Sequence, residues 1–249
     1  MTALKKLART VLPKPLRQLL CVQNRQFVFR RAMDQLLRDP RCLNDDDDVL
    51  TALSYGWGNT FWSASDEYVL ACALHAWASD GPILECGSGL TTLVLGAIAQ
   101  KMGRTVWTLE HTERWARRVR RYLRHYRIRS VRVMLQPLRD YGPYCWYAPQ
   151  LDKMPEAFGL VVCDGPPHHT PGGRYGFLPV MSDRLPAGAT ILLDDAGRAP
   201  ERTIAARWAD ELGTTFTALG TRNRDRYIRI TVPERRRRVA PPPAARDLA

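Results

Sequence analysis

The sequence lacks several features that would assign it to common protein classes. Its 249 residues include six cysteines, but no pair has C-x-x-C spacing and no histidine spacing suggests a zinc site. No stretch approaches the roughly 20 apolar residues of a membrane span, and no internal repeat is present. We therefore expect a protein without structural zinc or disulfides, a pattern typical of the reducing cytoplasm.

Acidic residues are scarce relative to basic ones, with 25 Asp and Glu against 37 Lys and Arg, so the formal net charge is +12. Such an excess favours an acidic partner, namely nucleic acid, an anionic membrane surface or an acidic substrate. Seven arginines lie in residues 113–127, where Trp115, Val119, Tyr122 and Tyr126 recur at helical spacing. The aromatic and apolar side chains would face the core, so this pattern favours a solvated arginine face over nucleic-acid contact.

Residues 1–64 are predicted to be a basic, helical extension. Its first part indicates helices that are broken at Pro13 and Pro15, followed by an acidic break at residues 44–48. A short amphipathic segment before Pro13 leaves a weak peripheral membrane contact open, although packing onto the protein's own core is favoured.

Residues 53–63 combine aromatic side chains with glycine, which predicts a structured loop. Tyr55, Trp57, Phe61 and Trp62 would either form a lid over a ligand or pack into the core. The other end of the chain, residues 233–249, is rich in arginine and proline. It has too little apolar surface to fold, so we expect it to be disordered and dispensable.

Between these extensions, residues 65–232 alternate between predicted strands and helices. This alternation indicates an α/β domain with a mostly parallel sheet and helices on both faces. Strands are expected at 83–85, 105–109, 131–135, 158–163 and 189–193, and helices at 65–77, 91–102, 113–127, 178–185 and 200–212. The last two strands, at 214–219 and 227–232, are joined by a turn too short for a crossover helix, so they must pair antiparallel.

The stretch ILECGSGLTT joins the first strand to a helix. Gly87 and Gly89 let the backbone approach a ligand closely, and the helix N-terminus offers free N–H groups. A side chain at either glycine would collide with the ligand or strain the turn, so we expect Gly87→Val to remove ligand binding while the fold persists. A tight turn without a ligand is the alternative. Thr92 stands where the dinucleotide motif G-x-G-x-x-G has its third glycine, which disfavours NAD.

Glu110 ends the next strand, 25 residues after Glu85. An acidic residue at this position can accept hydrogen bonds from both ribose hydroxyls of a nucleotide. The alternative is that it stabilises the following helix through the helix dipole.

These features together resemble the class I S-adenosylmethionine (SAM)-dependent methyltransferases. The resemblance rests on E-x-G-x-G, the acidic end of the second strand, V-V-C-D at the fourth and the antiparallel ending, and it covers roughly residues 65–232. It implies a Rossmann-like fold and SAM as the methyl donor, with Asp164 beside the site of methyl transfer. The implied cofactor residues are Glu85, Gly87, Ser88 and Gly89 for the amino-acid part, Glu110 for the ribose, Gln136, Pro137 or Leu138 for the adenine, and Asp164.

The stretch DGPP…GGRYGFLPVMSDRLPAGATILLDD is similar to small-molecule and sugar O-methyltransferases. In the macrolide-sugar type, acidic residues ending the fourth and fifth strands bind a divalent metal, and Asp164, Asp194 and Asp195 match them in position. Pro166 departs from that pattern. Three close carboxylates repel one another, and Mg²⁺ would relieve the repulsion. The alternative is that Asp194 or Asp195 caps the loop and pairs with Arg198.

Three side chains after Asp164 are candidates for contact with the acceptor. His168 and His169 could act as the general base, since histidine titrates near pH ~6.5, or they could lie in an exposed loop. Arg174 could clamp a carboxylate or phosphate of the acceptor, or it could be a surface arginine.

The sequence therefore predicts a cytoplasmic SAM-dependent methyltransferase that methylates an oxygen of a small molecule or sugar. An RNA methyltransferase would explain the charge, but no appended RNA-binding module is recognisable. A non-catalytic SAM-binding protein and an NAD-dependent oxidoreductase are further alternatives.

Overall fold

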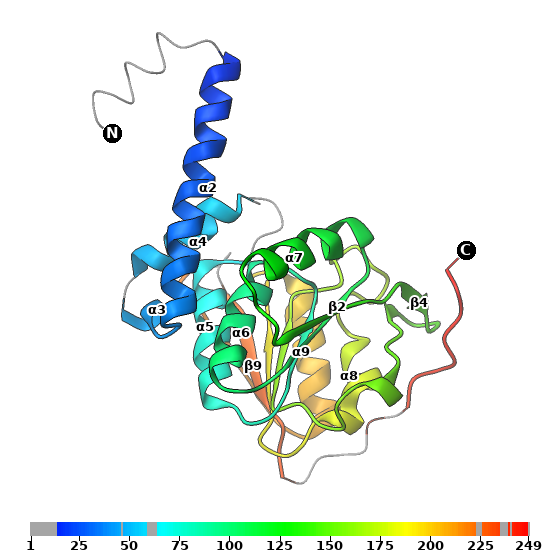
Figure 1. Ribbon diagram of the computed structural model, residues 1–249. Coiled ribbons are helices and arrows are strands. Elements are labelled where there is room, and N and C mark those ends of the chain that lie inside the picture. Colours follow the sequence, from blue (N-terminus) through cyan, green and yellow to red (C-terminus); the bar gives the residue numbers. More distant parts are fainter. Residues whose placement is uncertain are drawn as a thin grey trace. The chain divides into compact units, whose positions relative to one another are not determined.

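The computed structural model describes residues 14–45, 47–58, 64–222, 226–234, 239 and 241–248, with side chains from residue 20 onward (Figure 1). The chain divides into two compact units, Met1–Ser63 and Ala64–Ala249. Among the helices of the described ranges, none combines the length and the apolar character needed to cross a membrane. The predicted amphipathic segment before Pro13 lies outside the described residues.

Helices α2 (Lys14–Arg38), α3 (Cys42–Asp45) and α4 (Asp47–Trp57) make up the described part of the first unit. Pro15 does not break a helix, because it lies in the first turn of α2, where a missing N–H costs nothing. The predicted acidic break at residues 44–48 is narrower than expected, because α3 ends at Asp45 and α4 begins at Asp47. Asp47 and Asp48 occupy the first turn of α4, where negative charge favours a helix.

The expected aromatic loop starts inside α4. Trp57 is buried, and its ring centroid lies 6.1 Å from that of Phe29 on α2. The Tyr55 hydroxyl accepts a hydrogen bond from Asn24 Nδ2 at 3.2 Å. Tyr55 and Trp57 thus belong to the packing of their own unit, while Phe61 and Trp62 lie outside the described residues.

The second unit is the predicted α/β domain. In the described residues, its main sheet has seven strands in the order β3-β2-β1-β6-β7-β9-β8, parallel except for the antiparallel β9. The strands are β1 (Ile83–Cys86), β2 (Val106–Glu110), β3 (Val131–Leu135), β6 (Leu160–Cys163), β7 (Thr190–Leu193), β8 (Phe216–Leu219) and β9 (Tyr227–Thr231). The main helices are α5 (Asp66–Ala78), α6 (Leu90–Lys101), α7 (Glu113–His125), α8 (Phe177–Met181) and α9 (Ala199–Leu212). The expected Rossmann-like architecture and antiparallel ending are confirmed.

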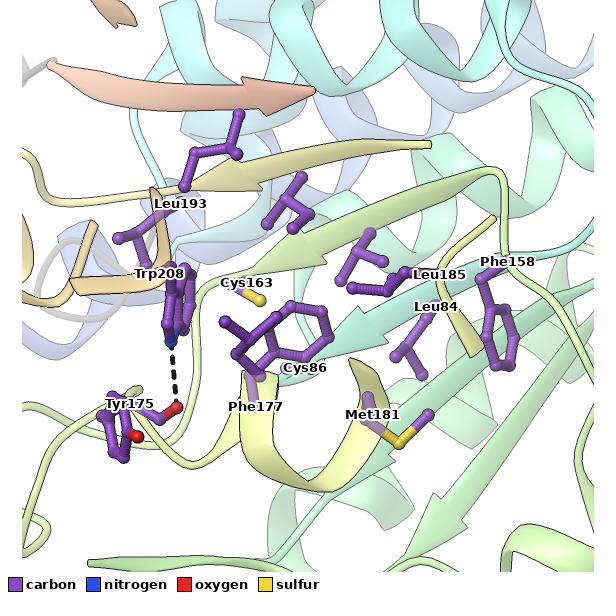
Figure 2. Close-up of a cluster of buried hydrophobic side chains, with 14 of the residues drawn as sticks. Leu84, Cys86, Phe158, Cys163, Tyr175, Phe177, Met181, Leu185, Leu193 and Trp208 are labelled. Carbon is purple, nitrogen blue, oxygen red and sulfur yellow. Dashed lines mark hydrogen bonds between the residues drawn. The ribbon is translucent and has the colours of Figure 1, made fainter. Parts of the chain in front are cut away.

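Helices cover both faces of this sheet because side chains alternate along each buried strand. Leu84, Cys163 and Leu193 point to one face, where they pack with Phe177 of α8 and Trp208 of α9 (Figure 2). The Trp208 indole donates a hydrogen bond to the Tyr175 carbonyl at 3.0 Å, which ties α9 to the segment before α8. Side chains at the alternate positions point to the other face, which α5 and α6 cover (Figure 1).

A small hairpin that the sequence analysis did not predict lies beside the main sheet. Strand β4 (Leu138–Asp140) pairs antiparallel with β5 (Cys145–Tyr147). Part of the tail that was expected to be disordered is described and contacts this hairpin, because the backbones of Asp140 and Arg246 exchange hydrogen bonds of 3.0 and 2.7 Å. Another boundary is corrected: α8 ends at Met181, and the predicted helix continues only as a 3-10 turn, Ser182–Arg184.

Candidate active site at the carboxyl ends of the strands

The loop from β1 to α6 lies against the loop that follows β6. Gly87 has a φ of +88°, and a Cβ there would lie 3.0 Å from the Gly165 nitrogen. The N–H groups of Asp164 and Gly165 both donate to the Cys86 carbonyl, at 3.0 and 2.7 Å. Glycine is therefore required at position 87 by the protein's own backbone, before any ligand is considered.

Glu85 stabilises this loop through hydrogen bonds to three threonines. Its buried carboxylate accepts hydrogen bonds from the hydroxyls of Thr91, Thr92 and Thr108, at 2.6, 2.7 and 2.7 Å. Thr92 Oγ1 in turn accepts from the Gly89 N–H at 2.9 Å. The resemblance implied that Glu85 contacts SAM. That contact stays a prediction; in the structure both carboxylate oxygens accept from hydroxyl groups, and Glu85 connects β1, β2 and the start of α6.

Burial raises the pKa of Glu85 to about 7, although the three threonine hydroxyls oppose the shift. An acid whose pKa rises on folding stabilises the fold most below its unfolded pKa, and this contribution is lost as the pH rises through the folded pKa. We expect the free energy of unfolding to fall by about 3 kcal/mol from below pH ~4.5 to above pH ~7 through this residue.

The measurement is denaturant unfolding across this pH range for the natural protein and Glu85→Gln. The variant keeps the side chain's size but cannot ionise, so the difference in stability between the two proteins isolates Glu85. A difference that does not change with pH would show that Glu85 does not titrate in this range.

Glu110, at the end of β2, also contacts this loop. Its Oε2 accepts from the Ser88 N–H at 3.1 Å and from the Ser88 hydroxyl at 2.7 Å, and its Oε1 accepts from the Thr112 N–H at 2.8 Å. Trp115 Nε1 donates to the Ser88 carbonyl. The predicted ribose-binding residue is therefore next to the glycine loop, and it also performs the helix-stabilising task that was its alternative.

The residues expected near an adenine follow β3. The Gln136 N–H donates to the Glu110 carbonyl at 2.7 Å, so this segment lies beside the end of β2. Leu138 begins β4 and packs partly against the core cluster, while Pro137 is exposed. Gln136 thus lies near the other candidate residues, and Leu138 contributes to the core.

Asp164, Asp194 and Asp195 come together at the ends of the neighbouring strands β6 and β7. One carboxylate oxygen from each lies within 4.8 Å of the others. Arg174, which sequence reasoning placed at the acceptor or on the surface, is buried among them: its Nη2 donates to Asp164 Oδ1 at 3.1 Å and to Asp195 Oδ2 at 2.7 Å. Arg198 Nη1 donates to the same Asp195 oxygen at 2.9 Å.

Burial dominates the electrostatics of this trio. It raises the pKa of Asp164 to about 6, opposed by Arg174 and assisted by Asp195. Burial and the neighbouring carboxylates also raise the pKa of Asp194 well above its ordinary range. The Asp164 side chain is 27% exposed, so a ligand can contact its carboxylate.

The trio does not fit a resident divalent metal while Arg174 is in place. Mg²⁺ and Ca²⁺ need carboxylate oxygens at about 2.0–2.6 Å. A guanidinium nitrogen already binds two of the three carboxylates, so an ion between them would contact a positive charge. We therefore derive no chemical step through a metal.

His168 and His169 are exposed in the loop after Asp164, with ring centroids 5.6 Å apart. Sequence reasoning missed His111, whose Nδ1 lies 3.3 Å from Glu110 Oε1. Burial lowers the pKa of His111, Glu110 opposes the shift and His169 adds to it, so the two histidines are neighbours. His111 could have been identified from the sequence because it directly follows the acidic residue that ends β2.

Tyr147 on β5 is another residue that the sequence did not single out. It is fully buried, and a Cβ at Gly165 would lie 2.5 Å from its hydroxyl. Its ring centroid is 6.1 Å from that of His111. The unpredicted hairpin therefore supplies one wall beside the loops that follow β1 and β6.

Comparison with known proteins agrees with this geometry. Residues 84–196 match the sequence model of a family described as a methyltransferase domain. No curated protein gives a significant match to the chain.

Solved methyltransferases share the fold. The O-methyltransferase from Bacillus cereus in complex with S-adenosylhomocysteine (SAH) has a TM-score of 0.51 at 18% identity, covering 85% of this chain and 99% of that one. An SAH-bound methyltransferase from Podospora anserina has a TM-score of 0.55 at 14% identity, covering 89% and 98%. The SAM-bound O-methyltransferase from Streptomyces achromogenes involved in tomaymycin synthesis has a TM-score of 0.51 at 15% identity, covering 79% and 89%.

The glycine loop, the acidic strand ends and the sheet order define a Rossmann-like α/β fold, which the chain shares with solved methyltransferases. Within this fold, residues 84–196 match a methyltransferase domain.

Proposed function

We propose that the protein transfers the methyl group of SAM to a hydroxyl oxygen of a small molecule or sugar. The observation that carries this proposal is the position of Asp164. A Cβ at Gly87 would lie 3.3 Å from the backbone carbonyl carbon of Asp164, so the backbone of Asp164 adjoins the glycine loop, and its carboxylate is partly exposed. It thus lies where a bound donor and an acceptor would meet.

The proposed cofactor site uses the residues around that loop. The backbone at Gly89, where a Cβ would meet only Thr91 Oγ1 at 3.9 Å, leaves room for the amino-acid part of SAM beside Gly87 and Ser88, and the start of α6 adds its N–H groups. Glu110 accepts the ribose hydroxyls, with the Ser88 hydrogen bonds rearranging around it. Gln136 lies where an adenine would follow.

Methyl transfer is a single displacement at carbon. The acceptor oxygen forms a bond to the methyl carbon as the carbon–sulfur bond breaks, and the sulfonium becomes the neutral sulfur of SAH. The hydroxyl proton passes to a base. Asp164 orients the hydroxyl and accepts the proton, and the exposed His168 and His169, in the loop that follows Asp164, carry the proton to water.

RNA is the second candidate acceptor, favoured by one observation. Helix α7 exposes Arg114, Arg117, Arg121 and Arg124 along one side. Other arginines of this helix are engaged within the protein: Arg120 donates to the Val133 carbonyl at 2.6 Å and Arg118 lies over the Trp115 ring. The engaged arginines favour the small-molecule proposal.

The test is transfer of labelled methyl from SAM to panels of hydroxylated small molecules, sugars, acidic metabolites and RNA. We expect turnover on a hydroxylated small molecule that is insensitive to salt. Transfer to RNA that weakens steeply with salt would favour the second candidate, because phosphate contacts release counter-ions. SAM binding without turnover on any panel would indicate a non-catalytic protein.

A further inference from the structure

The buried guanidinium of Arg174 joins the ends of two neighbouring strands. Its Nη1 donates to the Asp194 carbonyl at 2.8 Å, and its Nη2 donates to the Asp164 carbonyl at 2.9 Å. The same Nη2 contacts Asp164 Oδ1 and Asp195 Oδ2, as described above. With only 3% of its side chain exposed, Arg174 is a fixed internal cation rather than a surface group.

Arg174 lies among carboxylates that keep an excess of negative charge. Asp164, Asp194, Asp195 and Glu201 contribute a formal charge of −4, and Arg174 and Arg198 contribute +2, so the six groups sum to −2. Because the Arg174 guanidinium already contacts Asp164 and Asp195, a divalent cation between them would bring two cations into contact in a buried site, which is costly. The guanidinium thus occupies the position that a metal ion would take.

We propose that Arg174 takes the place of a divalent metal in this active site. It offsets part of the negative charge of the acidic trio, holds the Asp164 carboxylate in a fixed orientation and makes the site independent of metal ions. Arg174 is thus a positioning residue that acts through Asp164. The proposal deepens the proposed function, but its metal-binding consequences hold whatever the acceptor is.

The geometry of arginine suits this task better than that of lysine. The two terminal nitrogens reach different strand ends at once, Nη1 toward β7 and Nη2 toward both β6 and Asp195. A lysine ammonium is a point charge on a flexible stem and cannot form this planar fork. Lysine would keep the charge and lose the orientation.

Titration with Mn²⁺, followed by the electron paramagnetic resonance of the free ion, tests this proposal without an assay of activity. We expect no binding by the natural protein up to about 1 mM, the weak end of protein sites for hard divalent ions. Arg174→Met removes the charge and keeps the length, and it should gain a Mn²⁺ site at least about tenfold tighter. Arg174→Lys should not gain the site.

Arg198→Met is the matched control, because Arg198 also binds Asp195 but has 46% of its side chain exposed. It should bind no Mn²⁺. Tight Mn²⁺ binding by the natural protein that Asp195→Asn abolishes would overturn the proposal, as would a folded Arg174→Met protein without a Mn²⁺ site. If Arg174→Met does not fold, Arg174→Gln is measured in its place, and the natural protein's own titration still decides the first point.

Once an acceptor is known, the second test measures kcat and the affinity for SAM separately. Natural turnover should be unchanged by a chelator, whereas Arg174→Lys should lower kcat with little change in the affinity for SAM. Chelator inhibition that added Mn²⁺ reverses would also overturn the proposal. An absence of turnover on every acceptor would count against the proposed function alone, since Mn²⁺ binding is measured separately.

Discussion

Replacement of Gly89 by valine is expected to lower the affinity for SAM by about a hundredfold or more while the protein stays folded. Gly89 has an extended φ of −169°, which any residue adopts. A Cβ there would meet only Thr91 Oγ1 at 3.9 Å, so the valine side chain enters open space at the N-terminus of α6. That space is where the proposed cofactor binds.

The measurement is calorimetric titration of SAM together with thermal unfolding. Gly87→Val is the contrasting variant: a positive φ and a contact of 3.0 Å with Gly165 mean that it should lose stability as well as binding. The sequence predicted that Gly87→Val would leave the fold intact; the structure instead leads us to expect a loss of stability. Unchanged SAM affinity in Gly89→Val would remove the cofactor from this loop.

The fold was predictable because its signals are local and repeated. Most of the parallel strands are short apolar runs that end at, or are followed by, an acidic residue or a glycine, and helical patterns separate them except between β3 and β6. The antiparallel end followed from the short connection before Tyr227, since a parallel pair needs a longer crossover. Hydrophobic periodicity and connection length were sufficient for these elements.

The hairpin β4–β5 was not predictable because its strands have three residues each and show no period. What stabilises it is contact with distant segments. The Cys145 N–H donates to the Pro171 carbonyl at 2.8 Å, and the backbones of Asp140 and Arg246 exchange hydrogen bonds of 3.0 and 2.7 Å. These contacts position the hairpin so that Tyr147 lies at the candidate site, and the sequence gives no local signal for them.

The role of Arg174 could not be read from the sequence for a similar reason. Polar loop arginines are usually exposed, and its neighbours in GGRYG carry no charge. Its partners lie 10 and 21 residues away along the chain, at strand ends that only the folded sheet brings together. The acidic residues themselves were recognisable because the carboxyl ends of parallel strands meet at one edge.

The replacement of Asp164 by asparagine is expected to lower kcat by about 10²- to 10⁴-fold, the range for loss of a general base. Asparagine keeps the size of the side chain and an oxygen for Arg174, but it cannot accept the acceptor's proton. Because the proposed SAM site is formed mainly by the loop after β1, the affinity for SAM should change little. The measurement is turnover under saturating SAM, with calorimetric titration of the cofactor.

The pH dependence of turnover assigns this effect to Asp164. The carboxylate must be ionised to accept a proton, and its pKa is about 6. The kcat of the natural protein should therefore fall about tenfold per pH unit below pH ~6 and level off above it. This acidic limb should disappear in Asp164→Asn and persist in His168→Asn and His169→Asn. A limb that is lost in a histidine variant and kept in Asp164→Asn would assign the base to that histidine, leaving Asp164 to orient the acceptor.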